Sequence, residues 1–433
     1  MPADKSSGQH NSSPSTEPSA TSESNSNISD NSGVENNQSS TPTDLSNVSG
    51  TASSPNATNT EKNQSYYAST VDTALGTQLT DEINDASNAN NLAKTQVSSA
   101  WDDGYTGKGM VIAVIDLGFN PNNDNMTLDD PDSAAISQTE AETKISNLGY
   151  GVYENSKVPF FYNYVDNSDT ETNDGKTDHG MMVSGVVAAD KPTSGTSQYM
   201  LGTAPEAQLL MMRVVDEFPN EQAEDVARAI RDAVYLGADV ITLSVAQGIP
   251  SQSDTDLEQS AIQYAIDTGV FVSVAAANNG DSASDASGAS TGLDDNGSTE
   301  SQPVTNGGAI ADPGISQNAM TVAAETNSTN LDSADLTDSL WTNMANVDTM
   351  AYFSSNGPTS DFTLKPDISS PGWDVQSLSL QNTNSFDGDS GTSFATPYLA
   401  GLATLVLQKL KGTTSLQGAD LVRTAKLILK KYC

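Results

Sequence analysis

Ser393 is the residue of this sequence best placed to act as a nucleophile. It follows a glycine, Gly391, and stands at the start of an apolar run that extends to Leu410. A glycine turn that leads into a helix would direct unpaired backbone N–H groups and the positive end of the helix dipole toward the serine oxygen. Such surroundings favour developing negative charge. A serine before a helix is more often only an N-cap, so other residues must decide between the two interpretations.

An acid and an imidazole could complete a catalytic set with this serine. Asp116 ends the β-branched apolar run 111–115 and is followed by Gly118, which is typical of an acid at the carboxyl end of a buried parallel strand. His179 starts a second apolar run. The chain has 2 histidines, and the other, His10, lies in a segment too polar to fold, so a mechanism that needs an imidazole base must use His179. Taken alone, such a histidine is more often structural.

Five sequence blocks resemble the signature blocks of subtilisin-like serine proteases. They are residues 107–118, 179–180, 202–205, 276–280 and 391–393. The order of acid, histidine and serine along the chain is also that of subtilisin, and it differs from the orders in chymotrypsin and the α/β-hydrolases. The resemblance covers about residues 95–430. Residues 107–109, the acidic insertions and residues 365–372 are most similar to the lactocepin-type cell-envelope proteinases of lactic acid bacteria.

The resemblance implies a role for each matching residue. His179 would be the general base for Ser393, and Asp116 would orient the imidazole. Asn279 would bind the oxyanion together with the backbone N–H group of the serine. The substrate-binding residues implied by the resemblance are Ser244, Val245, Ala246, Ala276, Ala277 and Asn278. Asn278 stands where this family usually has glycine. Two alternatives stay open: the asparagine segment as an ordinary turn, and the substrate-binding segments as plain strand ends.

Alternating strand and helix patterns predict an α/β fold. Short apolar runs predict strands at residues 110–115, 208–214, 239–243 and 270–275, and helical patterns are found at residues 179–189, 221–236, 257–267, 393–410 and 416–429. This alternation is typical of a mostly parallel sheet with helices on both faces, which binds ligands at the carboxyl ends of its strands. Asp116 and Asn279 both fall at such ends. The resemblance implies that the fold is the three-layer subtilisin-like one.

Two segments of different character are predicted. Residues 1–64 are rich in Ser, Thr and Asn and have no aromatic residue before Tyr66, so they are expected to form a disordered tail. Residues 65–433 are expected to form the peptidase domain, truncated at its C-terminal end, with Trp101 and Tyr105 anchoring the segment before the first strand. No signal peptide or anchor is visible in the sequence, and the resemblance alone implies secretion or a place at the cell surface.

The strongly acidic composition limits the partners of this chain. Its formal net charge is −38 and its pI is about 4.1, which argues against nucleic acid, because phosphate binding depends on clustered Lys and Arg. The apolar run 393–410 is interrupted too often to span a membrane. Cys433 is the single cysteine and cannot form an intramolecular disulfide.

The implied chemistry requires no cofactor, but three acidic loops raise a hypothesis of structural calcium. These loops are residues 122–130, 166–174 and 281–295. Hard cations bind several oxygen ligands in flexible loops, yet none of these loops has the EF-hand spacing, and most acidic runs are solvated surface. The metal ligands are therefore left unassigned by the sequence.

Three functions of different classes are compatible with these observations. The first is a serine endopeptidase that cleaves extended segments of extracellular proteins, which requires Asp116, His179, Ser393 and the oxyanion asparagine to act together. The second is a truncated, inactive relic that serves as an acidic surface or binding protein. A cytosolic esterase is a distant third, because the same triad cleaves activated esters. The intact set of reactive residues favours the endopeptidase.

Overall fold

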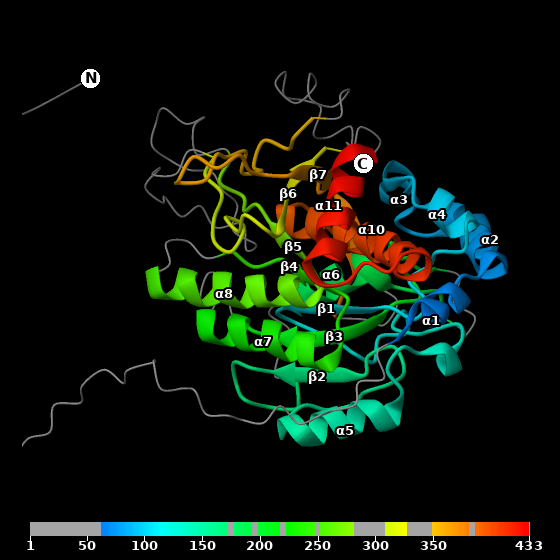
Figure 1. The fold of residues 1–433 in the computed structure, drawn as a ribbon. Helices are drawn as coiled ribbons and strands as arrows, with labels where there is room; N and C mark the ends of the chain where they lie inside the picture. The colour runs from blue at the N-terminus through cyan, green and yellow to red at the C-terminus, as the bar shows by residue number, and fades with distance from the viewer. Residues whose placement is uncertain are drawn as a thin grey trace, which may run out of the picture. The chain divides into compact units, whose positions relative to one another are not determined.

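A parallel sheet forms the centre of the computed structural model (Figure 1). The structure describes residues 62–171, 177–192, 198–216, 222–246, 252–280, 308–326, 349–380 and 386–432. The strands, in their order across the sheet, are β2 (Phe160–Asn163), β3 (Gln208–Arg213), β1 (Val111–Asp116), β4 (Val240–Leu243), β5 (Phe271–Ala275), β6 (Met320–Glu325) and β7 (Ile368–Pro371). All neighbouring pairs of these strands are parallel.

The strand order creates a crevice at the carboxyl edge of the sheet. In the sheet, β2 and β3 lie on one side of β1, and β4 to β7 lie on the other. The order of the strands therefore reverses between β1 and β4. Open parallel sheets bind ligands at such a point. Every residue of β1, β3, β4 and β5 is buried, as expected for strands that are covered on both faces. The four strands predicted from apolar runs are confirmed.

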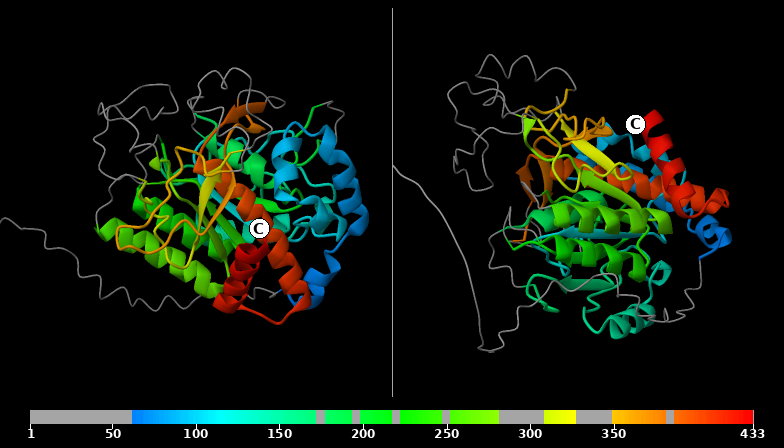
Figure 2. Two further views of the ribbon diagram at one scale, coloured as in Figure 1. Left: turned by 90° about the horizontal axis from the view of Figure 1, so that it is seen from above. Right: turned by 60° about the vertical axis from the view of Figure 1, so that its left-hand side comes forward.

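Two pairs of helices cover the two faces of the sheet and complete the predicted three-layer α/β fold (Figures 1 and 2). Helices α6 (His179–Ala188) and α10 (Thr392–Thr413) pack against each other, and α10 also contacts β4 to β7. Helices α7 (Ala223–Leu236) and α8 (Gln252–Thr268) pack together on the other face. The helix α8 begins before the predicted residue 257, because its first turns are polar and give no apolar period.

Short helices precede the sheet, and the first of them packs against α10. They are α1 (Gln64–Ser69), α2 (Thr73–Glu82), η2 (Ile83–Asp85), α3 (Ala89–Thr95) and α4 (Ser98–Asp102). Trp101 is fully buried and its Nε1 donates a hydrogen bond of 3.1 Å to the carbonyl of Thr203, while Tyr105 packs against the core. The predicted anchoring by these two aromatic residues is confirmed. The predicted tail of residues 1–64 lies outside the described residues except for its last three, and α1 already begins at Gln64.

The remaining elements lie around this central unit. They are η3 (Pro131–Ser133), α5 (Gln138–Leu148), the antiparallel pair β8 (Val375–Leu378) and β9 (Phe386–Asp389), and α11 (Gly418–Tyr432). Strand β8 packs on α6, and α11 packs against α10 and α8. In the part of the chain that the structure describes, no helix has the length and apolar character that crossing a membrane requires.

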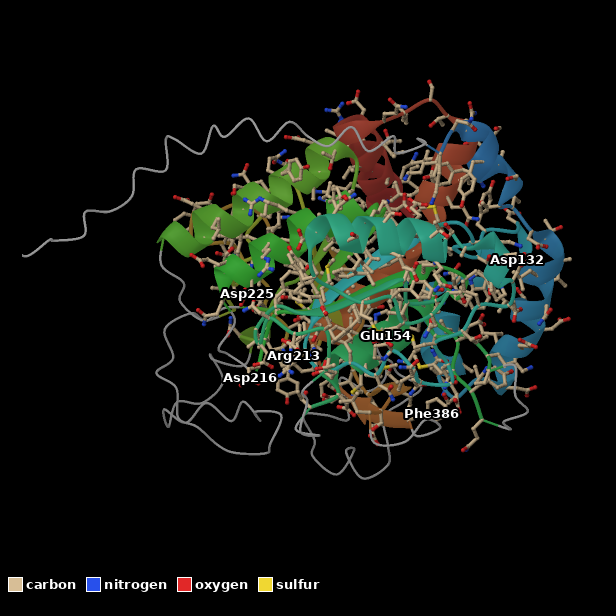
Figure 3. The ribbon with its side chains drawn as sticks, turned by 90° about the horizontal axis from the view of Figure 1, so that it is seen from below. Asp132, Glu154, Arg213, Asp216, Asp225 and Phe386 are labelled. Carbon is tan, nitrogen blue, oxygen red and sulfur yellow. The ribbon has the colours of Figure 1, made fainter. Side chains whose placement is uncertain are left out.

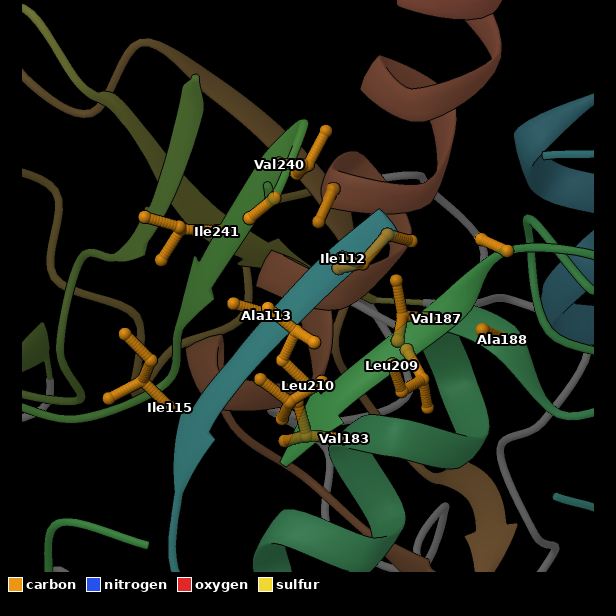
Figure 4. Close-up of a cluster of buried hydrophobic side chains, with 14 of the residues drawn as sticks. Ile112, Ala113, Ile115, Val183, Val187, Ala188, Leu209, Leu210, Val240 and Ile241 are labelled. Atoms are coloured by element: carbon orange, nitrogen blue, oxygen red, sulfur yellow. The ribbon is translucent and has the colours of Figure 1, made fainter. Parts of the chain in front are cut away.

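A buried hydrophobic cluster joins α6 to β1, the strand that ends with Asp116, and to its neighbours (Figure 4). Ile112 of β1, Val183 and Val187 of α6 and Leu209 of β3 belong to this cluster, and all four are fully buried. Full burial of each such aliphatic side chain contributes about 1.5–3 kcal/mol. All ten residues of α6 are buried. The helix that begins with His179 is therefore held firmly against the strand that ends with Asp116.

Candidate active site

Asp116 and His179 form a buried hydrogen-bonded pair. The Nδ1 atom of His179 lies 2.6 Å from Oδ1 of Asp116, and the two residues are 7% and 0% exposed. The backbone N–H of Leu117 also donates to Oδ1 of Asp116, at 2.8 Å. A carboxylate at Nδ1 keeps the proton on that nitrogen, which makes Nε2 the basic nitrogen of the ring, the one suited to take a proton from a nucleophile. The structure thus brings two of the three predicted triad residues into the expected relation.

A close backbone contact fixes the distance between the acid and the histidine. The N–H of Gly180 donates to the carbonyl of Leu117 at 2.6 Å, which ties the start of α6 to the end of β1. A Cβ atom on residue 180 would lie only 2.6 Å from that same carbonyl oxygen. Only glycine permits this approach, so the glycine after the histidine has a packing role.

An ion-pair network holds the loop that follows Asp116. Arg213 ends β3, beside Asp116 in the register of the sheet, and its guanidinium is 2.7 Å from Glu171 and 2.8 Å from Asp216 (Figure 3). Glu171 in turn accepts a hydrogen bond of 3.2 Å from the N–H of Phe119. This network could not be recognised in the sequence, because acidic residues are so frequent in the chain that Glu171 does not stand out.

Ser393 lies in the first turn of α10, and the residue after it contacts His179. The ring of Phe394, the next residue, has its centroid 5.3 Å from that of the imidazole. The Ser393 hydroxyl donates a hydrogen bond of 3.2 Å to the carbonyl of Ser244, and the Ser244 hydroxyl donates to the carbonyl of Ser393 at 2.8 Å. A hydroxyl has one proton, so transfer of that proton to His179 requires the O–H bond of Ser393 to turn away from the carbonyl of Ser244. Catalytic hydrogen bonds often tighten only when substrate binds.

The two neighbouring asparagines make different side-chain contacts, which bears on the prediction for the oxyanion residue. The side-chain Oδ1 of Asn278 accepts hydrogen bonds of 3.0 Å from both the N–H and the hydroxyl of Thr392, the residue before the serine. The side-chain Nδ2 of Asn279 instead donates to the carbonyl of Ala309 at 3.2 Å. The geometry therefore places Asn278, and not Asn279, against the serine turn.

The backbone of Ala277 explains the offset between the two asparagines. Ala277 has a φ of 79°, a left-handed conformation that favours glycine. Asn278 was predicted to occupy the place where the family usually has glycine, but the conformation that calls for glycine is found one residue earlier. These contacts favour Asn278 over the predicted Asn279 as the oxyanion residue, and Asn278 is moved from the substrate pocket to the oxyanion site as a proposal.

The other predicted substrate-binding residues lie at the carboxyl ends of β4 and β5. Ser244, Val245 and Ala246 follow β4, and the first two are buried while Ala246 is half-buried. Ala276 and Ala277 follow β5 and are buried, and the carbonyl of Ala277 accepts a hydrogen bond from the N–H of Ser355. Ser244 touches the nucleophile directly. Binding of substrate by all five residues remains a prediction, since burial also fits plain strand ends.

The segments around Phe353 and Gly372 hold residues 276–280 and the turn before Ser393 in place. The N–H of Gly280 donates to the carbonyl of Phe353, and the N–H of Gly391 donates to the carbonyl of Gly372, both at 2.8 Å. Phe353 and Trp373 stack with ring centroids 5.7 Å apart. These aromatic residues were missed in the sequence, where neither has a recognisable spacing relative to Ser393.

The three acidic loops of the calcium hypothesis differ in how far the structure describes them. Residues 281–295 lie outside the described residues, as do residues 172–176. The loop of residues 122–130 is described, and its Asp129 approaches two other carboxylates away from the active site.

The sequence of this chain is similar to those of known proteases. A family model described as Peptidase S8, subtilase family, matches residues 107–430. The PI-type proteinase of Lactococcus lactis subsp. cremoris is 34% identical over 247 residues, which is 55% of this chain and 12% of that protein. The C5a peptidase of Streptococcus pyogenes serotype M18 is 34% identical over 224 residues, or 49% of this chain and 18% of that protein. This chain thus matches less than a fifth of the length of either relative.

Solved structures of proteases are also similar to this chain. The S41 psychrophilic protease shows 25% identity over 74% of this chain and 83% of that chain, with a TM-score of 0.48. Sphericase shows 23% identity over 74% of this chain and 82% of that chain, with the same TM-score of 0.48. The family match spans most of the chain, including the acid, the histidine and the serine. This chain belongs to the subtilase family of serine-type peptidases.

Proposed function

We propose that this chain is an endopeptidase that cleaves extended segments of extracellular proteins through Asp116, His179 and Ser393. The observation that carries the proposal is the 2.6 Å contact between Asp116 and His179 at the sheet edge from which α10 presents the serine. An acid, an imidazole and a hydroxyl that converge in this order constitute the machinery of acyl transfer.

The first half of the reaction would form an acyl-enzyme. As Oγ of Ser393 attacks the substrate carbonyl carbon, its proton passes to Nε2 of His179, and Asp116 stabilises the imidazolium that results. The carbonyl oxygen becomes an oxyanion, and the tetrahedral carbon then expels the amine. His179 returns the proton to that leaving nitrogen, so the peptide bond is broken and the N-terminal fragment stays as an ester of Ser393.

The second half would repeat these steps with water. His179 takes a proton from a water molecule as its oxygen attacks the ester carbonyl, and it then returns the proton to Oγ of Ser393. The carboxylic acid product leaves and the serine is restored. No cofactor takes part in either half of this sequence.

Two donors would stabilise the oxyanion in both halves. The N–H of Ser393 lies in the first turn of α10, where helix N–H groups have no acceptor four residues before them. The second donor would be Nδ2 of Asn278, because its Oδ1 is held by Thr392 and the amide is thereby oriented beside the serine turn. Donors fixed before the reaction stabilise a developing charge without reorganisation.

The substrate would bind along the strand ends on either side of the serine. The segment 244–246 follows β4, and an extended peptide can pair with such a segment through backbone hydrogen bonds. The relatives are named a proteinase and a C5a peptidase, so protein or peptide substrates are expected. Secretion or attachment to the cell surface is proposed here on the family resemblance.

An inactive relic remains the second candidate. The observation that favours it is the hydrogen bond from the Ser393 hydroxyl to the carbonyl of Ser244, which directs the reactive proton away from His179. In that case the acidic surface of the chain, and not its triad, would carry the function.

Incubation with an unfolded protein would separate these two candidates. The purified chain is expected to cut reduced and alkylated casein into fragments, because an unfolded chain can adopt the extended conformation that the site requires. The Ser393→Ala variant, matched in every other residue, is expected to leave the casein intact. Equal fragmentation by both proteins would identify a contaminating protease, and intact casein with both would favour the relic. Mass spectrometry of the fragments reports the cleavage positions.

A further inference from the structure

Three aromatic side chains that solvent can reach lie next to the turn before Ser393. They are Tyr352, Phe353 and Trp373, and we call them the aromatic group. The rings of Phe353 and Trp373 are stacked with centroids 5.7 Å apart, and the ring of Tyr352 lies 5.5 Å from each of them. Tyr352 is 37% exposed, and the other two are half-buried. Aromatic rings at the surface beside a reactive serine are available to contact a substrate.

Backbone contacts hold the aromatic group close to the nucleophile. The carbonyl of Phe353 accepts a hydrogen bond of 2.8 Å from the N–H of Gly280. The carbonyl of Gly372, the residue before Trp373, accepts one of 2.8 Å from the N–H of Gly391. A Cβ atom on residue 372 would lie 2.8 Å from the carbonyl oxygen of Gly391, an approach that only glycine permits. The backbone therefore fixes the position of Trp373 relative to the serine turn.

The aromatic group and the segment 244–246 lie on opposite sides of the serine turn. The turn is hydrogen-bonded to Ser244 after β4 and to Gly372 after β7, and β5 and β6 separate these two strands in the sheet. Strand β8, which begins two residues after Trp373, packs on α6, and His179 at the start of α6 would protonate the leaving amine. The part of the substrate that follows the cut bond is therefore the part expected over the aromatic group.

The neighbourhood of the aromatic group is acidic. Asp374 directly follows it, and the N–H of Asp374 donates a hydrogen bond of 2.9 Å to the hydroxyl of Ser390, just beyond β9. Asp387 and Asp389 of β9 are exposed, and their spacing of two residues places them on one face of the strand. Lys365 is the single lysine or arginine in residues 349–408, and it is buried in an ion pair. This surface therefore attracts cations.

Aromatic faces next to carboxylates suit a guanidinium or an ammonium group. The face of a ring attracts a cation, and arginine can stack on the ring while its N–H groups bond to carboxylates. This fold contains such an arrangement elsewhere. The guanidinium carbon of Arg228 lies 4.4 Å and 5.1 Å from the ring centroids of Tyr150 and Tyr164, and the hydroxyls of both tyrosines donate to Asp232. The aromatic group and its aspartates offer the same chemistry at the surface.

We propose that the aromatic group, together with Asp374, Asp387 and Asp389, binds a basic side chain of the substrate within the first three residues after the cut bond. Arginine is expected to bind better than lysine, because its planar group stacks on a ring. The inference rests on the proposed endopeptidase function and adds to it a preference for the part of the substrate that leaves first. The chemical step itself stays with His179 and Ser393.

Peptides that differ at one position test this preference. A peptide taken from casein that the wild type cuts once is synthesised with Arg, Leu or Glu at each of the first three positions after the cut bond. At one of these positions we expect kcat/KM to be about tenfold higher with Arg than with Glu, the scale of a few exposed cation contacts, and also higher with Arg than with Leu. Because salt screens exposed charges, the ratio of Arg to Glu should shrink in about 0.5 M NaCl.

Variants of the surface locate the preference. Asp387→Asn combined with Asp389→Asn should reduce the ratio of Arg to Glu to about threefold or less. Asparagine at residue 389 keeps the oxygen that accepts a hydrogen bond from the N–H of Ser390. Tyr352→Ala, which removes an exposed ring, should lower the ratio too. Asp132→Asn, at an exposed position in another part of the chain (Figure 3), should leave it unchanged. Because the whole chain is acidic, this last control separates the proposed surface from general attraction.

Three results would overturn the inference: equal rates for the Arg and Glu peptides, faster cleavage with Leu than with Arg, or an undiminished ratio in the double aspartate variant. Binding of the same labelled peptides to Ser393→Ala, measured by fluorescence anisotropy, separates the inference from the proposed function. If the wild type cuts no peptide, tighter binding of Arg than of Glu that is lost in the double aspartate variant would support the surface and reject the peptidase. Equal binding of Arg and Glu would reject the surface.

Discussion

Replacement of His179 by alanine is expected to lower kcat for a peptide cleaved by the wild type by about 10⁶-fold, the scale established for the equivalent change in subtilisin. The imidazole is the only group placed by Asp116 to accept the serine proton, at 2.6 Å from its Oδ1. Because the loss affects the chemical step, KM should change much less than kcat. Steady-state kinetics on the peptide measures both constants, and the slow variant is assayed at a high enzyme concentration.

Asp116→Asn is a second variant that tests the same pair of residues. The substitution keeps the size of the side chain but offers an amide where Nδ1 of His179 requires an acceptor, so the wrong tautomer is favoured. A loss of about 10⁴-fold in kcat is expected. A loss of less than about tenfold for either variant would show that cleavage does not use this pair.

Replacement of Asn278 by alanine is expected to lower kcat about 10²- to 10³-fold, whereas Asn279→Ala should change it by less than about threefold. The magnitude is that known for removal of the oxyanion asparagine in subtilisin, a member of the same family. The difference between the two variants follows from the structure, since Asn278 contacts Thr392 beside the serine and Asn279 donates to Ala309. Kinetics on one peptide substrate compares the two variants directly.

Asn278→Asp separates donation to the oxyanion from support of the serine turn. Aspartate retains an oxygen for the N–H and hydroxyl of Thr392 but has no N–H to donate, and its charge would repel the oxyanion. We expect its kcat to fall at least as far as that of Asn278→Ala. Wild-type kcat in Asn278→Asp would limit the residue to holding the turn, and a large loss in Asn279→Ala alone would restore the assignment made from the sequence.

Strong periodic patterns and the family blocks predicted most of the fold. The four apolar strands at the centre of the sheet are buried on both faces, so their sequences are continuous hydrophobic runs that stand out. The edge strand β7 was missed because its sequence, from Ile368 to Pro371, is short and half polar. The strand β2 was missed because it is short, with four residues.

Side-chain direction is what the sequence could not provide at the active site. Two adjacent asparagines are equally able to donate a hydrogen bond, and the resemblance assigned Asn279 by assuming that Asn278 replaces a glycine. The left-handed conformation belongs instead to Ala277, with a φ of 79°, a fact of the backbone that an alanine does not reveal. Similarly, the bond from Ser393 to Ser244 depends on a side-chain rotation that no sequence pattern specifies.

Labelling with a serine-reactive fluorophosphonate tests the central claim most directly, because the probe reacts only with a serine that is activated by its surroundings. The account predicts strong labelling of the purified wild-type chain and none of Ser393→Ala or His179→Ala, with all three shown to unfold cooperatively. Peptide profiling would then identify the preferred cleavage sequence. A folded wild-type chain that takes up no label would contradict the account and direct attention to what its acidic surface binds.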